Sequence, residues 1–311
     1  MIAHYAKRSE GEQFEEASPS LKSGVWVNAT KVDKIELAEL TKKYQLDGNI
    51  LRDVHDSDEL PRLEFSNDAA YVFLRLPHLA RSGRVGAMPL LCVVKDHQFF
   101  TISTAETISL DLVMQSTVPK TTSDTHVLLL GVIASSVAEF EELITHTARS
   151  ITDTANRLKT HEVTNHDFIH FVTVEHNLNA CKMNLESTLT MVMRLRDNTR
   201  EFLTEEDFEA LDDVRLHIQQ LLAAITSHTQ SVASIRNAYS TIANNKLNQR
   251  MKTLTILTVL ITLPNVVYGM YGMNVTLPFE KEPWAYFGIV SITVVLTALV
   301  FIVAKARGYF K

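Results

Sequence analysis

The chain has 311 residues, of which 46% are hydrophobic, and its formal net charge at pH 7 is −6. This acidic balance argues against a nucleic-acid-binding protein, and a content of only ten Gly and eight Pro excludes a collagen-like or low-complexity chain. Two cysteines, Cys92 and Cys181, are too few for a disulfide framework or for a zinc site built of thiolates alone.

Short apolar or alternating runs predict the strands of a mixed α/β head in residues 1–130. We expect strands near residues 25–28, 70–76, 90–94, 99–103 and 126–132. The first eight residues contain no apolar segment of the kind found in secretory signals. We therefore expect residues 1–245 to be cytosolic.

A long helical region should follow the head, because every Gly and Pro lies outside residues 132–263. We expect breaks near 161–165 and 196–203, since Thr204 and the acids after it are typical of a helix N-terminus. The next helix breaker is Pro264, so the last helix should run for about 60 residues, or roughly 90 Å. These patterns divide the region into a cytosolic helical layer, 131–203, and a stalk helix, 204–250.

Two uncharged segments, 253–279 and 283–304, are each long enough to cross a bilayer, which takes roughly 20 residues. A buried hairpin of a soluble protein is the disfavoured alternative, because two long adjacent uncharged runs are rare there. Basic residues flank the outer ends of both segments and predict that both termini are cytoplasmic. We expect a first transmembrane helix at 251–274, an extracytoplasmic loop at 275–283, a second helix at 284–304 and a cytosolic tail at 305–311.

The first span carries a polar stripe. Thr255, Thr258, Thr262 and Asn265 are spaced by three, four and three residues, which keeps them on one helix face. Membrane helices tolerate single threonines, but a stripe of four polar side chains usually faces other helices or water. Two spans cannot enclose a pore, so a conduit would require an oligomer.

The segment Tyr271-Gly272-Met273-Asn274 ends the first span, before a short acidic loop and one final span. In this position it resembles the motif of the CorA family of divalent-cation channels, and Trp26 with segments 60–64 and 71–74 is similar to that family's early strand region. The resemblance implies an α+β cytosolic domain, a long stalk helix and two C-terminal transmembrane helices, assembled as a homopentamer in the cell (inner or plasma) membrane. It implies uptake of Mg²⁺, with Co²⁺ and Ni²⁺ as further candidate ions, and neither a covalently bound cofactor nor a nucleic-acid partner.

The resemblance also implies roles for particular residues. Tyr271, Gly272, Met273 and Asn274 would form the selectivity mouth, where a ring of amides can bind hydrated Mg²⁺ through its waters. Glu280 and Glu282 would attract cations to the loop. The pore-lining residues would be Asn248, Met251, Leu254, Thr255, Thr258, Thr262, Asn265 and Gly269. Met251 and Leu254 would form an apolar constriction that gates by dewetting.

Asp213 occupies the stalk position where the family places a regulatory metal ligand, although a solvated face beside Arg215 is the simpler interpretation. The turn that should supply a partner acid carries Arg81 and Arg84 instead. An arginine paired with Asp213 would mimic the metal's charge. We therefore expect closure to depend only weakly on cytosolic Mg²⁺ through this site.

Several alternatives stay open. His166 and His170, four residues apart, have the spacing of zinc ligands, but solvated histidines are the commoner case. Cys92 lies in an apolar run and is expected in the core. No residue has the partners of a nucleophile or general base, so an enzyme is not expected. The alternative functions are a zinc transporter of the ZntB-like branch and a membrane-anchored sensor or scaffold, which would need no polar stripe.

Overall fold

The computed structural model describes residues 1–9, 12–20, 23–105, 113, 121–160, 165–197, 203–274, 279 and 282–307. By their contacts, the residues form two compact units, Met1–Ser234 and Ile235–Lys311. The boundary between the units falls within one long helix.

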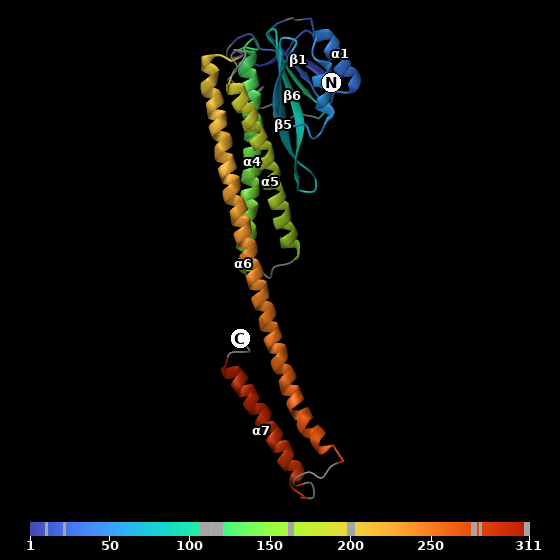
Figure 1. Ribbon diagram of the computed structural model, residues 1–311, viewed down its shortest axis with the longest axis vertical. Helices are drawn as coiled ribbons and strands as arrows, with labels where there is room; N and C mark the ends of the chain where they lie inside the picture. The colour runs from blue at the N-terminus through green and yellow to red at the C-terminus, as the bar shows by residue number, and fades with distance from the viewer. Residues whose placement is uncertain are drawn as a thin grey trace. The chain divides into compact units, whose positions relative to one another are not determined.

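The first unit is built on a seven-stranded sheet with the strand order β2-β1-β3-β7-β6-β5-β4 (Figure 1). The central pair, β3 and β7, is parallel, and every other neighbouring pair is antiparallel. The strands are β1 Ile2–Ala6, β2 Glu15–Glu16, β3 Val25–Ala29, β4 Arg62–Ser66, β5 Ala69–Leu79, β6 Val85–Lys95 and β7 Gln98–Ser103.

Three short helices pack on one face of the sheet: α1 (Lys34–Tyr44), α2 (Gly48–Arg52) and the 3₁₀ helix η1 (Asp53–His55). Alternate strand residues such as Val27 and Phe100 join Leu37 of α1 and Leu51 of α2 in one buried cluster. This alternation is what the period of two in a strand requires when one set of side chains faces a helix layer.

Two long helices, α4 (Thr125–Thr160) and α5 (Asn165–Arg196), form a hairpin on the opposite face, over β5 and β6 (Figure 1). The Ser136 hydroxyl donates a hydrogen bond to the Arg75 carbonyl, which fastens α4 to β5 at 3.1 Å. The tight turn between β5 and β6, with Gly83 at φ +77°, lies against α5. The first unit therefore has three layers: short helices, sheet and helical hairpin.

Four of the five expected strands are confirmed as parts of β3, β5, β6 and β7, whereas the strand expected at 126–132 is wrong. That segment is the first two turns of α4, and Leu128, Leu129 and Val132 are all buried. A helix whose start is buried on several sides has the same continuous apolar run as a buried strand, so periodicity cannot separate them.

The expected helix breaks agree with the structure, because α4 ends at Thr160, α5 spans Asn165–Arg196 and α6 begins at Glu205. The last helix is longer than the expected length of about 60 residues, since α6 passes through Pro264 to Tyr271 and is 67 residues long. Proline removes only one helical N–H donor, and a helix that can re-satisfy the freed carbonyl passes through it. The last helix, α7, spans Ala285–Ala306.

Candidate ion-conduction site

The C-terminal part of α6 has almost no cover from the rest of its own chain. From Met251 to Tyr271 every side chain is exposed or half-buried. Large apolar side chains are among them, including Leu254 at 56% and Leu257 at 52% exposure. Contiguous exposed apolar surface of this extent is rare on soluble proteins and marks contact with lipid or with other subunits.

Two helices among the described residues, α6 and α7, are long and apolar enough to cross a membrane. The apolar segment of α6 has none of its residues buried, and that of α7 has 11% buried. Helices at the core of a soluble protein would be mostly covered, so this exposure disfavours a buried soluble hairpin and fits two membrane spans.

The polar stripe lies along the exposed part of helix α6. Each of its threonine hydroxyls donates a hydrogen bond to the backbone carbonyl four residues earlier. Thr255 donates to the Met251 carbonyl at 2.8 Å, and Thr258 donates to the Leu254 carbonyl at 2.9 Å. Thr262 likewise donates to the Thr258 carbonyl at 2.7 Å. Each hydroxyl proton is therefore committed to the backbone one turn back, as is common for threonine in helices.

This hydrogen bonding leaves each threonine oxygen with acceptor capacity only. Water that coordinates a divalent cation points its oxygen at the ion and its hydrogens outward, so the hydrated cation presents donors. Mg²⁺ keeps several of its waters when it binds. A row of acceptors without free donors is thus matched to a hydrated cation and mismatched to an anion.

The Tyr-Gly-Met-Asn segment begins at the last residue of α6, Tyr271, and continues into the turn that follows the helix. The Gly272 N–H donates to the carbonyls of Tyr268 and Gly269 at 3.1 and 3.2 Å, and the Met273 N–H donates to the Met270 carbonyl at 3.3 Å. The negative end of the helix dipole therefore lies beside Asn274, where it favours a cation.

The four residues from Tyr271 to Asn274 are all exposed. Asn274 is the last described residue before a gap at 275–278. Of the two loop acids, Glu280 lies outside the described residues, and Glu282 is exposed, with its N–H bound to the Phe279 carbonyl at 3.0 Å. Asn248 and Gly269, at the two ends of the expected pore face, are also exposed.

Asp213 is exposed on α6, whereas its neighbour Asp212 is engaged. Asp212 binds Arg215 at 2.9 Å and Arg196 of α5 at 3.0 Å. The hydrogen bond from Arg215 and the charge of Arg196 lower the pKa of the Asp212 carboxyl from its usual range. The sequence alone does not distinguish these two adjacent acids, and the geometry assigns the bond between α5 and α6 to Asp212.

Arg81 and Arg84 lie in the turn between β5 and β6, and both are exposed. The turn is closed by bonds from the Ala80 N–H to the Arg84 carbonyl and from the Gly83 N–H to the Ala80 carbonyl, both at 2.9 Å. Within one chain, no ion pair among the described residues joins either arginine to Asp213. A bridge between neighbouring copies stays a prediction.

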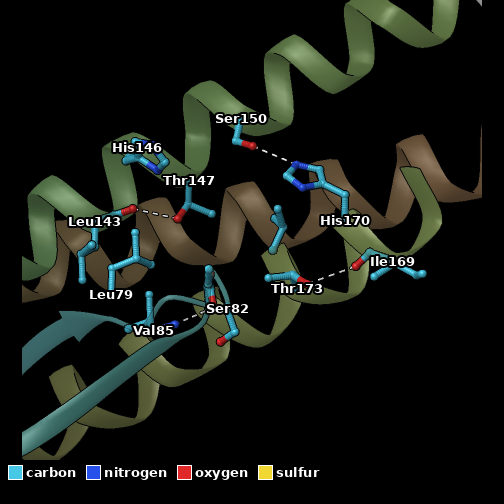
Figure 2. Close-up of a pocket in the computed structure, with 13 residues that line it drawn as sticks. Leu79, Ser82, Val85, Leu143, His146, Thr147, Ser150, Ile169, His170 and Thr173 are labelled. Atoms are coloured by element: carbon cyan, nitrogen blue, oxygen red, sulfur yellow. Dashed lines mark hydrogen bonds between the residues drawn. The ribbon is translucent and has the colours of Figure 1, made fainter. Parts of the chain in front are cut away.

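The described residues contain no group of three or more His, Cys, Asp or Glu placed to hold a metal ion. His170 is hydrogen-bonded through Nε2 to the Ser150 hydroxyl at 2.8 Å, across a cavity of about 290 Å³ between α4, α5 and the β5–β6 turn (Figure 2). The side chain of His166 lies outside the described residues. The hydrogen bond favours a structural role for His170.

Asn177 of α5 is a residue that the sequence analysis missed. Its Oδ1 accepts from the Val85 N–H and its Nδ2 donates to the Gly83 carbonyl, both at 2.9 Å. It thereby clamps the β5–β6 turn to α5. The only signal in the sequence was a polar residue at a position where the helix period predicts an apolar one.

The two cysteines have structural roles. Cys92 is fully buried on β6, as expected, and Cys181 is buried on α5. Burial raises the pKa of both thiols, that of Cys181 to about 12. Neither is a reactive thiolate at neutral pH.

Comparison with known proteins agrees with this geometry. A family model described as "CorA-like Mg2+ transporter protein" matches residues 22–305. The chain is 27% identical over 107 residues to the cobalt/magnesium transport protein CorA of Methanocaldococcus jannaschii, and the match spans 34% of this chain and about a third, 34%, of that curated relative's length.

Two solved structures share the fold. The complete CorA magnesium transporter of M. jannaschii matches with a TM-score of 0.86 at 16% identity, covering 99% of this chain and 98% of that one. The ZntB cytoplasmic domain of Vibrio parahaemolyticus matches with a TM-score of 0.63 at 8% identity, covering 78% and 98%. The family is one of ion transporters and not of enzymes. Because the family model matches from residue 22 to residue 305, the chain belongs to the CorA-like Mg²⁺ transporter family.

Proposed function

We propose that this chain assembles as a homopentamer that conducts divalent cations, with Mg²⁺ preferred, through a pore lined by α6. The observation that carries the proposal is the stripe of threonine oxygens that can only accept hydrogen bonds, on an exposed helix of membrane length. Family membership supports the same function. One chain has two such spans among its described residues, so several copies are needed to surround a pore.

In this proposal the ion keeps much of its hydration shell. A ring of Asn274 amides, one from each copy, accepts hydrogen bonds from the waters of Mg²⁺ at the mouth. The threonine oxygens continue this contact along the pore. Met251 and Leu254 then form an apolar constriction, where loss of water closes the path.

The charges of the chain support an orientation with both termini in the cytoplasm of a cell (inner or plasma) membrane. Basic residues precede the first span and follow the second, while Glu280 and Glu282 lie in the loop between them. The loop acids then face the side from which cations enter, and the membrane potential draws the ions inward.

A variant at the mouth tests this function. Asn274→Ala should reduce Mg²⁺ uptake into proteoliposomes with an imposed potential to the level of empty liposomes. Asn179→Ala, at an exposed position of α5, is the matched control and should transport normally. Both variants should still run as pentamers in light scattering. Ordinary uptake by Asn274→Ala would refute the selectivity ring, and a stable monomer or dimer of the parent protein would contradict a central pore.

Zinc transport is the second candidate, because the first unit's fold is shared with the ZntB cytoplasmic domain. Gly272-Met273-Asn274 favours Mg²⁺, since the resemblance to the zinc branch would imply valine in the middle position. Uptake of Mg²⁺ and Zn²⁺ should be compared in the same liposomes, with and without a potential and with and without a pH gradient. Uptake of Zn²⁺ that requires the pH gradient would favour the zinc transporter.

A further inference from the structure

The helical layer formed by α1, α2 and η1 contains a cavity of about 630 Å³. Thr41 of α1 and Gly48 of α2 mark the place where these helices converge, because a Cβ on Gly48 would lie 3.2 Å from the Thr41 methyl carbon. Lys34 lies two turns before Thr41 on α1, and His55 lies about two turns beyond Gly48. The two helical segments thus line a wedge, narrow at Thr41 and Gly48.

The inner part of the wedge is apolar. Leu37 and Leu51 line it and belong to the buried cluster under the sheet. Ala38 lines it as well, and its small side chain leaves the space open. The Thr41 hydroxyl donates to the Leu37 carbonyl at 2.8 Å, so this proton is unavailable to a ligand. A flat apolar group fits such a surface better than a polar one.

The charged residues that line the cavity are all basic. Lys34, Arg52 and His55 are exposed at its edge, and the described lining contains no acid. Arg52 is held in place by bonds from Nε to the Gly48 carbonyl at 3.0 Å and from Nη2 to the Asn49 side chain. The side chains of Lys34 and His55 make no hydrogen bond or ion pair within the described residues.

Four acids near the cavity in sequence have partners outside it, whereas Glu39, next to Ala38, is exposed and does not line the cavity. Asp33 caps α1 by accepting from the N–H groups of Ile35 and Glu36 at 2.8 Å. Three others bind groups outside the cavity: Glu36 the terminal amine at 3.1 Å, Asp47 the Ser66 hydroxyl at 2.8 Å, and Asp53 the Arg62 guanidinium at 2.7 Å. The lining itself therefore presents basic side chains and no acid, although the chain as a whole carries a net charge of −6.

We propose that this cavity binds a small organic phosphate, with its ring against Ala38 and the Thr41 methyl group and its phosphate between Lys34 and Arg52. Lys and Arg are the side chains that bind phosphate oxygens best. The volume lies within the range of about 300–1,000 Å³ that is usual for ligand pockets. Nucleoside monophosphates combine these features in the simplest form. The site uses no residue of the proposed pore, so a result against the proposed transport would not contradict this site.

Calorimetric titration of the full chain in detergent, with EDTA present to exclude metal bridges, tests the proposal. AMP supplies both ring and phosphate, adenosine supplies the ring alone, and inorganic phosphate supplies the charge alone. AMP should bind once per chain, at least about tenfold more tightly than either fragment. Equal affinity for AMP and inorganic phosphate, or no saturable binding of AMP at millimolar concentration, would overturn the site.

Three variants locate the binding. Lys34→Gln should weaken AMP binding about tenfold, and Ala38→Trp should abolish it by filling the apolar part of the cavity. Lys42→Gln is the matched control, since Lys42 is an exposed lysine on the same helix that does not line the cavity. Lys34 and Ala38 are exposed, so melting temperatures should match the parent's. Equal effects of Lys34→Gln and Lys42→Gln would mean diffuse charge attraction and would refute the site.

Discussion

Large apolar side chains are mostly buried in the first unit and mostly exposed in the second, and the two tryptophans illustrate this difference. Trp26, in the first unit, is 0% exposed and donates its indole N–H to the Thr101 hydroxyl at 2.8 Å. Trp284, in the second, is 54% exposed. The core of the first unit is covered by its own side chains, whereas in our proposal the second is covered by lipid and by further copies of the chain.

Threonine hydroxyl groups also have different kinds of hydrogen-bond partner in the two units. In the first unit the Thr101 hydroxyl satisfies buried partners, since it accepts from Trp26 and donates to the Asn28 side chain at 3.0 Å. In the second unit Thr255 and Thr258 bind their own helix and keep their oxygens on an exposed face. The same group is thus a core element in one unit and an ion-facing acceptor in our proposal for the other.

The largest effect should come from removing the buried tryptophan. Trp26→Ala should destabilise the first unit by about 3–5 kcal/mol, because a large cavity is left behind and the Thr101 hydroxyl loses the donor that it accepts from. Trp284→Ala should leave the unfolding of the first unit unchanged. Thermal unfolding of both variants in detergent, followed by circular dichroism, measures the contrast. Similar melting temperatures for the two variants would contradict the comparison.

A smaller effect is expected in the second unit when one acceptor is removed without a change of shape. Thr258→Val should reduce Mg²⁺ flux about tenfold, which corresponds to about 1.4 kcal/mol. Leu257→Val removes one methylene from the neighbouring apolar position and should leave the flux near the parent's. Proteoliposome flux at equal protein density measures both. Equal losses would argue against a special role for the polar face.

Loss of a helix cap should have a still smaller effect, confined to the first unit. Asp33 and Glu36 form a capping box at the start of α1. Asp33→Ala should cost about 1 kcal/mol of stability because two backbone N–H groups lose their acceptor. Glu39→Ala, at an exposed position of the same helix, should cost almost nothing. Thermal unfolding distinguishes these outcomes, and a large change in Mg²⁺ flux in Asp33→Ala would show unexpected coupling to the second unit.

The smallest effect is expected at Asp213. Flux should change little as internal Mg²⁺ rises from micromolar to millimolar, because Arg81 and Arg84 occupy the turn where the resemblance to the family implies an acidic partner for a shared ion. Asp213→Ala should therefore behave like the parent protein. Steep inhibition by internal Mg²⁺ in the parent, absent from the variant, would identify Asp213 as a metal ligand and show that the arginine argument is wrong.

Much of the first unit was predictable because its local patterns are strong. Strands β3, β5, β6 and β7 are runs of apolar residues bounded by turn signals, and residues 132–197 lack every helix breaker. The strands β1, β2 and β4 were missed because none of their residues is fully buried, so they lack the apolar pattern of β3. Their stability comes from pairing with a neighbouring strand, for which the local sequence contains little signal.

The site residues also divide into those that a local sequence pattern predicts and those that depend on contacts with another helix. The stripe of Thr255, Thr258 and Thr262 follows from helical periodicity alone, and the helix that carries it is present. The choice between Asp212 and Asp213 does not follow from the sequence, because it depends on the position of Arg196 on another helix. Likewise the partner of His170 is Ser150, twenty residues away on α4.

The sequence by itself determined the two apolar segments of membrane length, the helix breaks in the first unit and the polar face of α6. Each depends on the composition or periodicity of one continuous segment, and hydrogen bonding within a helix is local. Only the tertiary structure decided that residues 126–132 are helical and that Asn177 clamps a turn. It also brought Lys34, Arg52 and His55 to the edge of one cavity. These facts depend on contacts between distant segments, and the free energy of such contacts comes from burial and pairing that no single segment contains.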